Sequence, residues 1–352
     1  MSARIAVPSK VLGGFVAALF EAAGLSPAAA GRVGDALIEA DLSGRGSHGV
    51  LQAENYLARL MSGAMSTAEK PRIVSRSGGS VVLDAEGMEG HLAAEEAISI
   101  AIATAQANGV AAVAVRSAQH MGVAGRYVGI AAQAGCVALA MGNAKPVMPA
   151  PGGAERLVGT NPLAMGVPAP GGPIVLDMAT SAGTYGRIRH ARALGQPIPE
   201  GWALDAQGRP TTDAEAAMAG LLLPMAGAKG FALSFVIDLM AGLLSGGAWG
   251  DRLGALDDDT TKPQTSSYLF IVLDIAHFRD LPGFLDEAGE AVARVHNSRR
   301  AEGVDRLFTP GERSARTLAG SNGIVEIAPS VAQALAMRAH ALGVPVPPAL
   351  GV

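Results

Sequence analysis

The chain has 352 residues, of which 49% are hydrophobic and 16% are charged. This composition excludes an intrinsically disordered protein, and the length predicts more than one lobe. The formal net charge of −4 and the lack of Lys/Arg runs argue against a nucleic-acid partner. No run of 18 uncharged apolar residues predicts a membrane span. The single cysteine, Cys136, has no disulfide partner in the chain and suits a reducing cytoplasm.

Three helices are predicted in residues 8–62. The first covers about 11–23, the second begins at Ser26-Pro27, where Pro suits the first helical turn, and the third begins after His48. The sequence therefore opens with a helical lobe.

From residue 73 onward the pattern alternates between strands and helices. Strands are predicted at 80–87, 110–118 and 136–143, and helices at 91–109 and 124–135. The Pro/Gly-rich residues 145–181 predict a structured zone of loops and short strands. A helix near 228–245, a buried strand at 266–278 and helices at about 282–298 and 329–342 complete the chain. This order predicts an α/β (α+β) fold with a central sheet, in which the C-terminal helices complete the helical lobe.

The segment "SGRGSHGV" (43–50) presents a histidine in a glycine-rich turn. If a helix begins just after His48, then Gln52 and Tyr56 follow on the same helical face. One interpretation is a proton donor or acceptor with two hydrogen-bonding neighbours, aimed at a small polar ligand. The other is a histidine that caps a helix and a tyrosine at a domain seam. The residue pattern does not decide between these two interpretations.

A second histidine, His120 in "VRSAQHMGVAG" (115–125), follows a predicted strand, and strand exits are places where ligands bind. A solvated loop histidine is the alternative. Ser47 beside His48 is a weak case for a hydrolase, because we expect adjacent side chains to point apart and no G-x-S-x-G motif is present. No H-E-x-x-H motif, cysteine pair or His/Asp cluster predicts a metal site.

No G-x-G-x-x-G motif follows a predicted strand, so a dinucleotide, if bound, is not held in the Rossmann manner. A possible anion site is "AGAKGFALS" (226–234). Here Lys229-Gly230 opens a helix whose N-terminal amides and dipole favour a phosphate.

Seven segments along nearly the whole chain resemble the type-2 malate/L-lactate dehydrogenase family of NAD(P)-dependent oxidoreductases. They are "SHGV" (47–50) with Tyr56, "QHMGVAGRY" (119–127), "GTNPLAMGVPAP" (159–170), "PIVLDMATS" (173–181), "IPEGWALDAQGRPTTD" (198–213), "LLPMAGAKGFALSFVIDLMAGLLSG" (222–246) and "PGE" (310–312). The resemblance implies hydride transfer between NAD or NADP and a small 2-oxo acid or cyclic 2-imino acid.

The resemblance also implies a non-Rossmann fold, with a largely antiparallel central sheet for the dinucleotide and a helical domain made from both termini. On this basis residues 1–72 and 280–352 form the helical domain. Residues 73–279 form the cofactor-binding sheet domain, with an inserted loop and strand region around 145–225. A homodimer with active sites near the subunit interface is implied as well.

Carried over by motif, the resemblance makes His48 the acid/base that delivers a proton to the substrate carbonyl or imine, with His120 lining the same site. We expect Ser47, Gln52, Tyr56 and Lys145 to bind the substrate, although Gln52 and Lys145 stand where this sequence departs from the family. The implied cofactor-binding residues are Val175, Asp177, Met178, Ala179, Thr180, Ser181, Lys229, Gly230, Pro310, Gly311 and Glu312.

The sequence departs from the family where a carboxylate would be bound. Relatives commonly carry Arg four residues after this histidine, whereas here the position is Gln52, and an amide cannot replace a guanidinium. Either another cation, Arg45 or Lys145, takes over this role, or the substrate differs from a simple 2-oxo monocarboxylate. We hypothesise that Lys145 compensates for Gln52. Arg187 in "YGRI" is a further departure, since Gly-Lys is usual there. The alternative is a dinucleotide-binding protein of the same shape with lost or altered catalysis.

Overall fold

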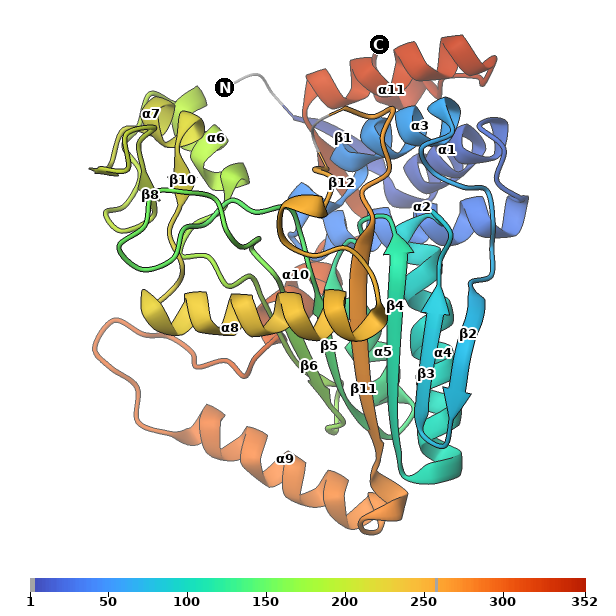
Figure 1. Cartoon of the computed structure of the whole chain (residues 1–352), viewed down its shortest axis with the longest axis vertical. Coiled ribbons are helices and arrows are strands. Elements are labelled where there is room, and N and C mark those ends of the chain that lie inside the picture. The colour runs from blue at the N-terminus through green and yellow to red at the C-terminus, as the bar shows by residue number, and fades with distance from the viewer. Residues whose placement is uncertain (1–3, 257–258) are drawn as a thin grey trace.

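The computed structural model describes residues 4–256 and 259–352. Within these residues the main sheet has the strand order β2-β3-β4-β11-β5-β6-β7 (Figure 1). Its strands are β2 (Arg72–Ser77), β3 (Ser80–Asp84), β4 (Val110–Ala118), β5 (Cys136–Gly142), β6 (Leu163–Val167), β7 (Ile174–Met178) and β11 (Ser266–Asp274). The β3–β4 pairing is parallel and the other pairings are antiparallel. The expected mixed α/β architecture with a largely antiparallel central sheet is therefore confirmed.

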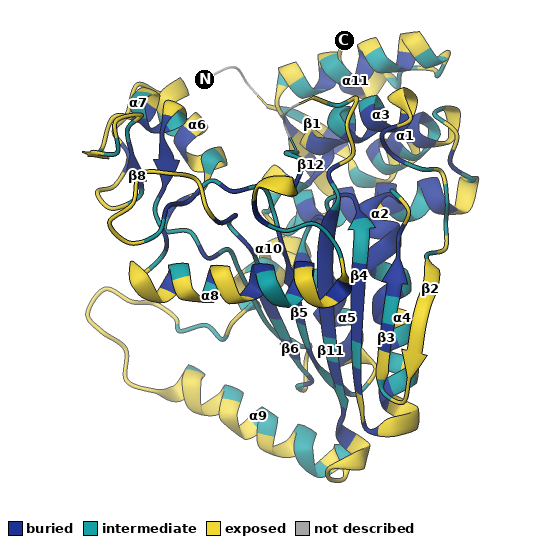
Figure 2. Cartoon of the chain, in the orientation of Figure 1, coloured by how far each residue is buried: buried dark blue, intermediate teal, exposed yellow. Residues whose placement is uncertain are grey.

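Helices cover both faces of this sheet, which explains why its central strands are continuous apolar runs. Helices α4 (Gly90–Asn108) and α5 (Ala124–Gln133) pack on one face. Helix α8 (Ala228–Asp238) lies across the other face and continues into a π-helical turn, Leu239–Leu243 (Figure 1). In β11 the side chains from 266 to 270 are all buried, as a strand covered on both faces requires (Figure 2).

A helical lobe stands at the end of the sheet from which β4 leads into the loop of His120. It contains α1 (Ser9–Ala22), α2 (Pro27–Leu42), α3 (Ala53–Ser62) and α11 (Pro329–Leu342), joined by the antiparallel pair β1 (Ile5–Pro8) and β12 (Ile324–Ile327) (Figure 1). The Ser26 hydroxyl accepts the N–H of Ala29 at 3.2 Å, so Ser26 caps α2 as its sequence predicts. Both ends of the chain thus contribute to this lobe.

Residues 182–223 form a small lobe with a core of its own. It contains α6 (Tyr185–Ala193), β8 (Ala203–Leu204), β9 (Pro210–Thr211), α7 (Ala214–Ala219) and β10 (Leu221–Leu222). Ile188, Ile198 and Leu222 are among its buried side chains. The lobe is inserted between β7 and α8, and so both of its connections lead to the site described below.

Helix α9 (Leu281–Asn297) lies apart from the terminal helices with which the sequence groups it. It contacts the 3-10 turn Ile275–His277 beyond β11, and none of its residues is buried (Figure 2). A linker from 298 to 311 then leads to α10 (Glu312–Gly320). Among the described residues, no helix is long and apolar enough to cross a membrane.

Candidate active site

The turn that carries His48 is built around the half-buried carboxylate of Asp41. Gly46–His48 and Val50–Gln52 form two consecutive 3-10 turns, and α3 begins only at Ala53. Asp41 of α2 accepts the N–H of Val50 at 2.8 Å, and a Cβ at Gly49 would lie 2.2 Å from the Asp41 carboxyl group. Only glycine fits at position 49, and its extended backbone breaks the continuous helical row expected for His48, Gln52 and Tyr56.

Each member of that expected row has a separate role in the structure. Gln52 is buried; its Nε2 donates to the Ser47 carbonyl at 2.9 Å, and its Oε1 accepts from Asn55 at 3.0 Å. The Ser47 hydroxyl lies 2.9 Å from His48 Nδ1. The expectation that Ser47 and His48 point apart was wrong, because the tight 3-10 turn brings the two side chains together.

The two histidines singled out in the sequence lie side by side. The His48 and His120 ring centroids are 5.4 Å apart. Tyr56, fully buried, places its hydroxyl 2.7 Å from His120 Nδ1, and the Gln264 side chain accepts the His120 backbone N–H at 2.9 Å. One ring nitrogen of each histidine is therefore in contact with a hydroxyl.

Burial makes both imidazoles weak bases. It lowers the pKa of His48, an effect that Asp177 opposes and Arg45 reinforces. Burial lowers the pKa of His120 well below its usual value, and the charges of His48 and His91 lower it further. Both rings are therefore neutral at neutral pH and ready to accept a proton.

An ion pair joins the His48 turn to the edge strand of the sheet. The Arg45 guanidinium contacts the Asp177 carboxylate on β7, and the same carboxylate oxygen accepts the N–H of Gly125 at 3.0 Å. The small lobe approaches the same turn, since a Cβ at Gly186 would lie 3.8 Å from the Cβ of Ser47. The helical lobe, the sheet and the small lobe thus converge beside His48.

The three segments expected to bind the dinucleotide meet along β7. At one end, the Val175 N–H donates to the Pro310 carbonyl at 3.1 Å, and a Cβ at Gly311 would lie 2.8 Å from the Val175 carbonyl oxygen. At the other end, the Met225 N–H donates to the Thr180 carbonyl at 2.9 Å. Asp177, Met178, Ala179 and Ser181 lie between or beside these contacts, and all four are half-buried.

The beginning of α8 has the chemistry that a phosphate requires. Gly227 precedes the helix with φ of 61° and offers no side-chain cap, and Lys229 is exposed in the first turn. A Cβ at Gly230 would lie 2.2 Å from the Met225 carbonyl oxygen, so this tight approach needs glycine. Uncapped backbone amides beside a lysine favour an anionic group, so the chemistry at this end of β7 is compatible with the phosphates of a dinucleotide.

Two expected site residues lie at the edges of this region. Glu312 begins α10, and its carboxylate contacts His296 Nε2 at 2.7 Å as well as Arg306 and the Thr309 N–H. The His296 hydrogen bond above all lowers the pKa of Glu312 to about 2. Lys145 is half-buried in the loop after β5, next to Ala144, whose N–H donates to Asn161 at 2.9 Å.

The sequence interpretation missed two features of the site. One is the Arg45–Asp177 pair, which joins residues far apart in the chain. The other is a buried pair, Glu89 and His91, directly behind Tyr56. The only sequence signal for it is a polar "EGH" just before the apolar "LAA" at the start of α4. In residues 4–256 and 259–352, no group of three or more His, Cys, Asp or Glu side chains is arranged to hold a metal ion.

Comparison with known proteins gives consistent matches over most of the chain. The family model described as malate/L-lactate dehydrogenase matches residues 7–336. The malate dehydrogenase of Pyrococcus abyssi is 33% identical over 322 residues, which cover 89% of this chain and 88% of that protein. The (2R)-3-sulfolactate dehydrogenase (NADP(+)) of Chromohalobacter salexigens is 37% identical over 252 residues, 71% of this chain and 75% of that protein.

Among solved structures, the sulfolactate dehydrogenase of Methanocaldococcus jannaschii superposes with a TM-score of 0.92 at 28% identity. The match covers 97% of this chain and 98% of that one. The similarity therefore extends over the helical lobe, the sheet and the small lobe together.

Proposed function

The chain belongs to the malate/L-lactate dehydrogenase family and is an NAD(P)-dependent oxidoreductase, and from this premise we propose that it works at the paired histidines His48 and His120. Its reaction interconverts a small 2-oxo acid, or a cyclic 2-imino acid, and the corresponding 2-hydroxy or amino acid. The observation that carries the proposal is the 5.4 Å separation of the His48 and His120 ring centroids, with the turn of His48 connected to β7 by the Arg45–Asp177 pair.

His48 acts as the acid/base, and His120 lines the same site. In the oxidative direction, neutral His48 accepts the proton of the substrate hydroxyl; in the reductive direction, protonated His48 returns it to the forming alkoxide or amine. Val175 to Ser181 and Lys229 would hold NAD(P), with Lys229 suited to its phosphates, and the bound cofactor would supply or accept the hydride. Pro310, Gly311 and Glu312 complete its binding site at the other end of β7.

In this proposal, two cations and the Ser47 hydroxyl hold the substrate acid. Ser47 is exposed and contacts His48, which supports direct contact with the substrate. Gln52 and Tyr56 act by holding the Ser47 carbonyl and His120. Lys145 supplies positive charge in place of the arginine missing at position 52, and Arg45, with a side chain 25% exposed, is the second cation.

The test is oxidation of NADH and of NADPH with a panel of acids: pyruvate, oxaloacetate, sulfopyruvate, diketogulonate and piperideine-2-carboxylate. Consumption of either cofactor with at least one acid supports the proposal. Failure with every acid, despite saturable cofactor binding, would favour a dinucleotide-binding protein with lost or altered catalysis.

We also propose that the enzyme is a homodimer, with a second copy of the chain covering α8 and α9. Helix α8 and the turn after it leave Phe235 45%, Leu243 50% and Leu244 62% exposed. Helix α9 is amphipathic and has no buried residue. Exposed apolar side chains such as those on α8 and the turn after it are typical of a subunit interface.

A cytoplasmic location is proposed as well. It is supported by the one thiol in the chain, Cys136, which is buried in β5 and has its pKa raised to about 11 by burial. Such a thiol is unreactive and needs no oxidising compartment. Fractionation of cells that express the tagged protein tests this location.

A further inference from the structure

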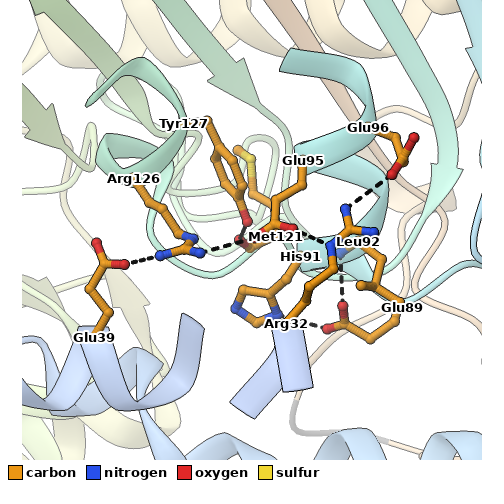
Figure 3. A network of polar contacts seen from close by, with 10 residues as sticks. All are labelled: Arg32, Glu39, Glu89, His91, Leu92, Glu95, Glu96, Met121, Arg126 and Tyr127. Carbon is orange, nitrogen blue, oxygen red and sulfur yellow. Dashed lines mark hydrogen bonds and ion pairs between the residues drawn. The ribbon is translucent and has the colours of Figure 1, made fainter. Parts of the chain in front are cut away.

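A buried carboxylate and a buried imidazole lie directly behind the paired histidines. Glu89 is 0% and His91 is 2% exposed, and Glu89 Oε1 lies 2.7 Å from His91 Nδ1. The other oxygen, Oε2, accepts the N–H of Leu92 at 3.0 Å and caps α4 (Figure 3). A buried polar pair of this kind seldom stabilises a fold more than apolar side chains of the same volume, so stability alone does not account for it.

His91 contacts both Tyr56, which meets the His120 ring, and Gly122, in the loop that carries His120. Its own ring meets that of Tyr56 edge to face, with centroids 5.8 Å apart, and the Tyr56 hydroxyl contacts His120 Nδ1. On its other side, a Cβ at Gly122 would lie 2.2 Å from His91 Nε2, so the backbone of Gly122 rests against that nitrogen. Gly122 has φ of 70°, in the left-handed region that favours glycine.

The start of α4 also meets His120 itself. A Cβ at Gly90 would lie 1.9 Å from the His120 carbonyl oxygen, and the Gln119 N–H donates to the Met88 carbonyl at 3.1 Å. The residues on either side of Glu89 therefore touch the loop 119–123. Any shift of this helix start would move His120.

Charged side chains tie α4 to its neighbouring helices. Arg32 of α2 contacts Glu95 at 2.6 Å and Glu96 at 3.1 Å, and Arg126 of α5 contacts Glu95 at 3.0 Å as well as Glu39 of α2 (Figure 3). These contacts link α2, α4 and α5. Helix α4, which carries His91, is therefore held by ion pairs to two neighbouring helices.

We propose that Glu89 and His91 form a positioning pair that holds the His120 ring in its working orientation through Tyr56 and Gly122; the inference rests on the proposed function of His120 in the active site. Glu89 orients the His91 ring through Nδ1. His91 then supports Tyr56 on one side and the loop 119–123 on the other. Neither Glu89 nor His91 reaches the substrate.

The test follows the His120 ring directly, by NMR of the full-length protein labelled with ¹⁵N-histidine. The chain has seven histidines, and His120→Gln identifies the His120 signals. The variants are His91→Gln, which keeps a donor for Glu89, and Tyr56→Phe, which removes only the hydroxyl. The matched control is His277→Gln, because His277 Nδ1 also lies 2.7 Å from a carboxylate, Asp274, but at the opposite end of β11.

In His91→Gln and Tyr56→Phe we expect the His120 ring nitrogens to shift and kcat to fall by about tenfold or more, since small misplacements of a reacting group are costly. KM for the acid should change little. In His91→Gln the pKa of His120 should rise, because the His91 charge that lowers it is gone. His277→Gln should change none of these quantities.

Unchanged His120 signals in a folded His91→Gln protein would overturn the proposal, whatever happens to kcat. If His91→Gln does not fold, unchanged His120 signals in Tyr56→Phe would overturn it instead. If the wild-type protein turns over none of the acids, the proposed function fails, but the NMR comparison still decides whether this pair positions His120.

Discussion

The Arg45 guanidinium is paired with the Asp177 carboxylate, and this contact joins the turn of His48 to strand β7. The proposed acid/base residue, His48, and the strand expected to hold the cofactor therefore come from different lobes, and this ion pair connects them. Arg45 also reinforces, and Asp177 opposes, the lowering of the pKa of His48. Changes at this pair should affect cofactor binding and proton transfer together.

The proposed roles of Lys145 and Arg45 can be separated by substitution. In Lys145→Ala we expect KM for the acid to rise about tenfold, because roughly one charge-assisted contact is lost. The Kd of the cofactor should not change. In Arg45→Gln both quantities should rise, because Asp177 loses its partner. Steady-state kinetics and cofactor fluorescence titration measure them, and Lys10→Ala, an exposed lysine on α1, is the control. An unchanged KM in Lys145→Ala would rule out Lys145 as the substrate anchor.

The pH dependence should differ between the two directions of reaction. Because burial lowers the pKa of His48 below 6.5, the ring is neutral above that pH and protonated only in acid. Oxidation of the 2-hydroxy acid needs the neutral ring, so kcat/KM should be flat above neutral pH and fall in acid. Reduction needs the protonated ring, so kcat/KM should fall as the pH rises. An oxidation rate that still rises between pH 8 and pH 10, by about tenfold per unit, would contradict His48 as the base.

Asp41 predicts a pH-dependent stability. Burial raises the pKa of its carboxyl group from 3.8 to about 6, so the folded state favours the protonated form. The stability that the folded state gains from protonated Asp41 is fully present below the unfolded pKa. It is lost as the pH rises through about 6, by at most about 3 kcal/mol. Urea unfolding of wild type and Asp41→Asn at several pH values measures it. The stability difference between the two proteins should change between pH 4 and pH 7, and a constant difference would refute the assignment.

The homodimer can be tested by light scattering after gel filtration. The wild-type chain of 35.4 kDa should elute with twice that mass. The double variant Leu243→Glu/Leu244→Glu should be monomeric, since it puts charge on the most exposed apolar part of the turn after α8. A control pair of substitutions at exposed apolar residues on other faces, Val110→Glu and Met337→Glu, should leave the dimer intact. A wild-type monomer would contradict the proposal.

The sequence predicts those parts of the fold whose signals are local. The apolar run of β11, the capped start of α2 and the alternation from β3 to β5 are visible in any short window. The pairing of β1 with β12 is not, because it joins four-residue segments from opposite ends of the chain. The grouping of α9 with the terminal helices followed chain order, whereas the structure has α9 against Ile275–His277.

The site residues likewise divide into those with a local sequence signal and those without one. His48, His120 and Lys229 lie in glycine-rich turns that the sequence alone marks as unusual. Their neighbours depend on tertiary contacts, and so no spacing rule brings Arg45 to Asp177, or Glu89 and His91 to the back of Tyr56. The contact between Ser47 and His48 was missed because a 3-10 turn, rather than an extended one, carries them.

The acid/base role of His48 is best tested by the turnover of NADH and NADPH with the panel of acids by wild type and by His48→Ala, with cofactor binding measured in both. We expect the wild type to turn over at least one acid. In His48→Ala we expect a loss of at least about a hundredfold with cofactor binding retained, as for the removal of a general acid/base. Near-normal turnover by a folded His48→Ala protein would show that His48 is not the acid/base.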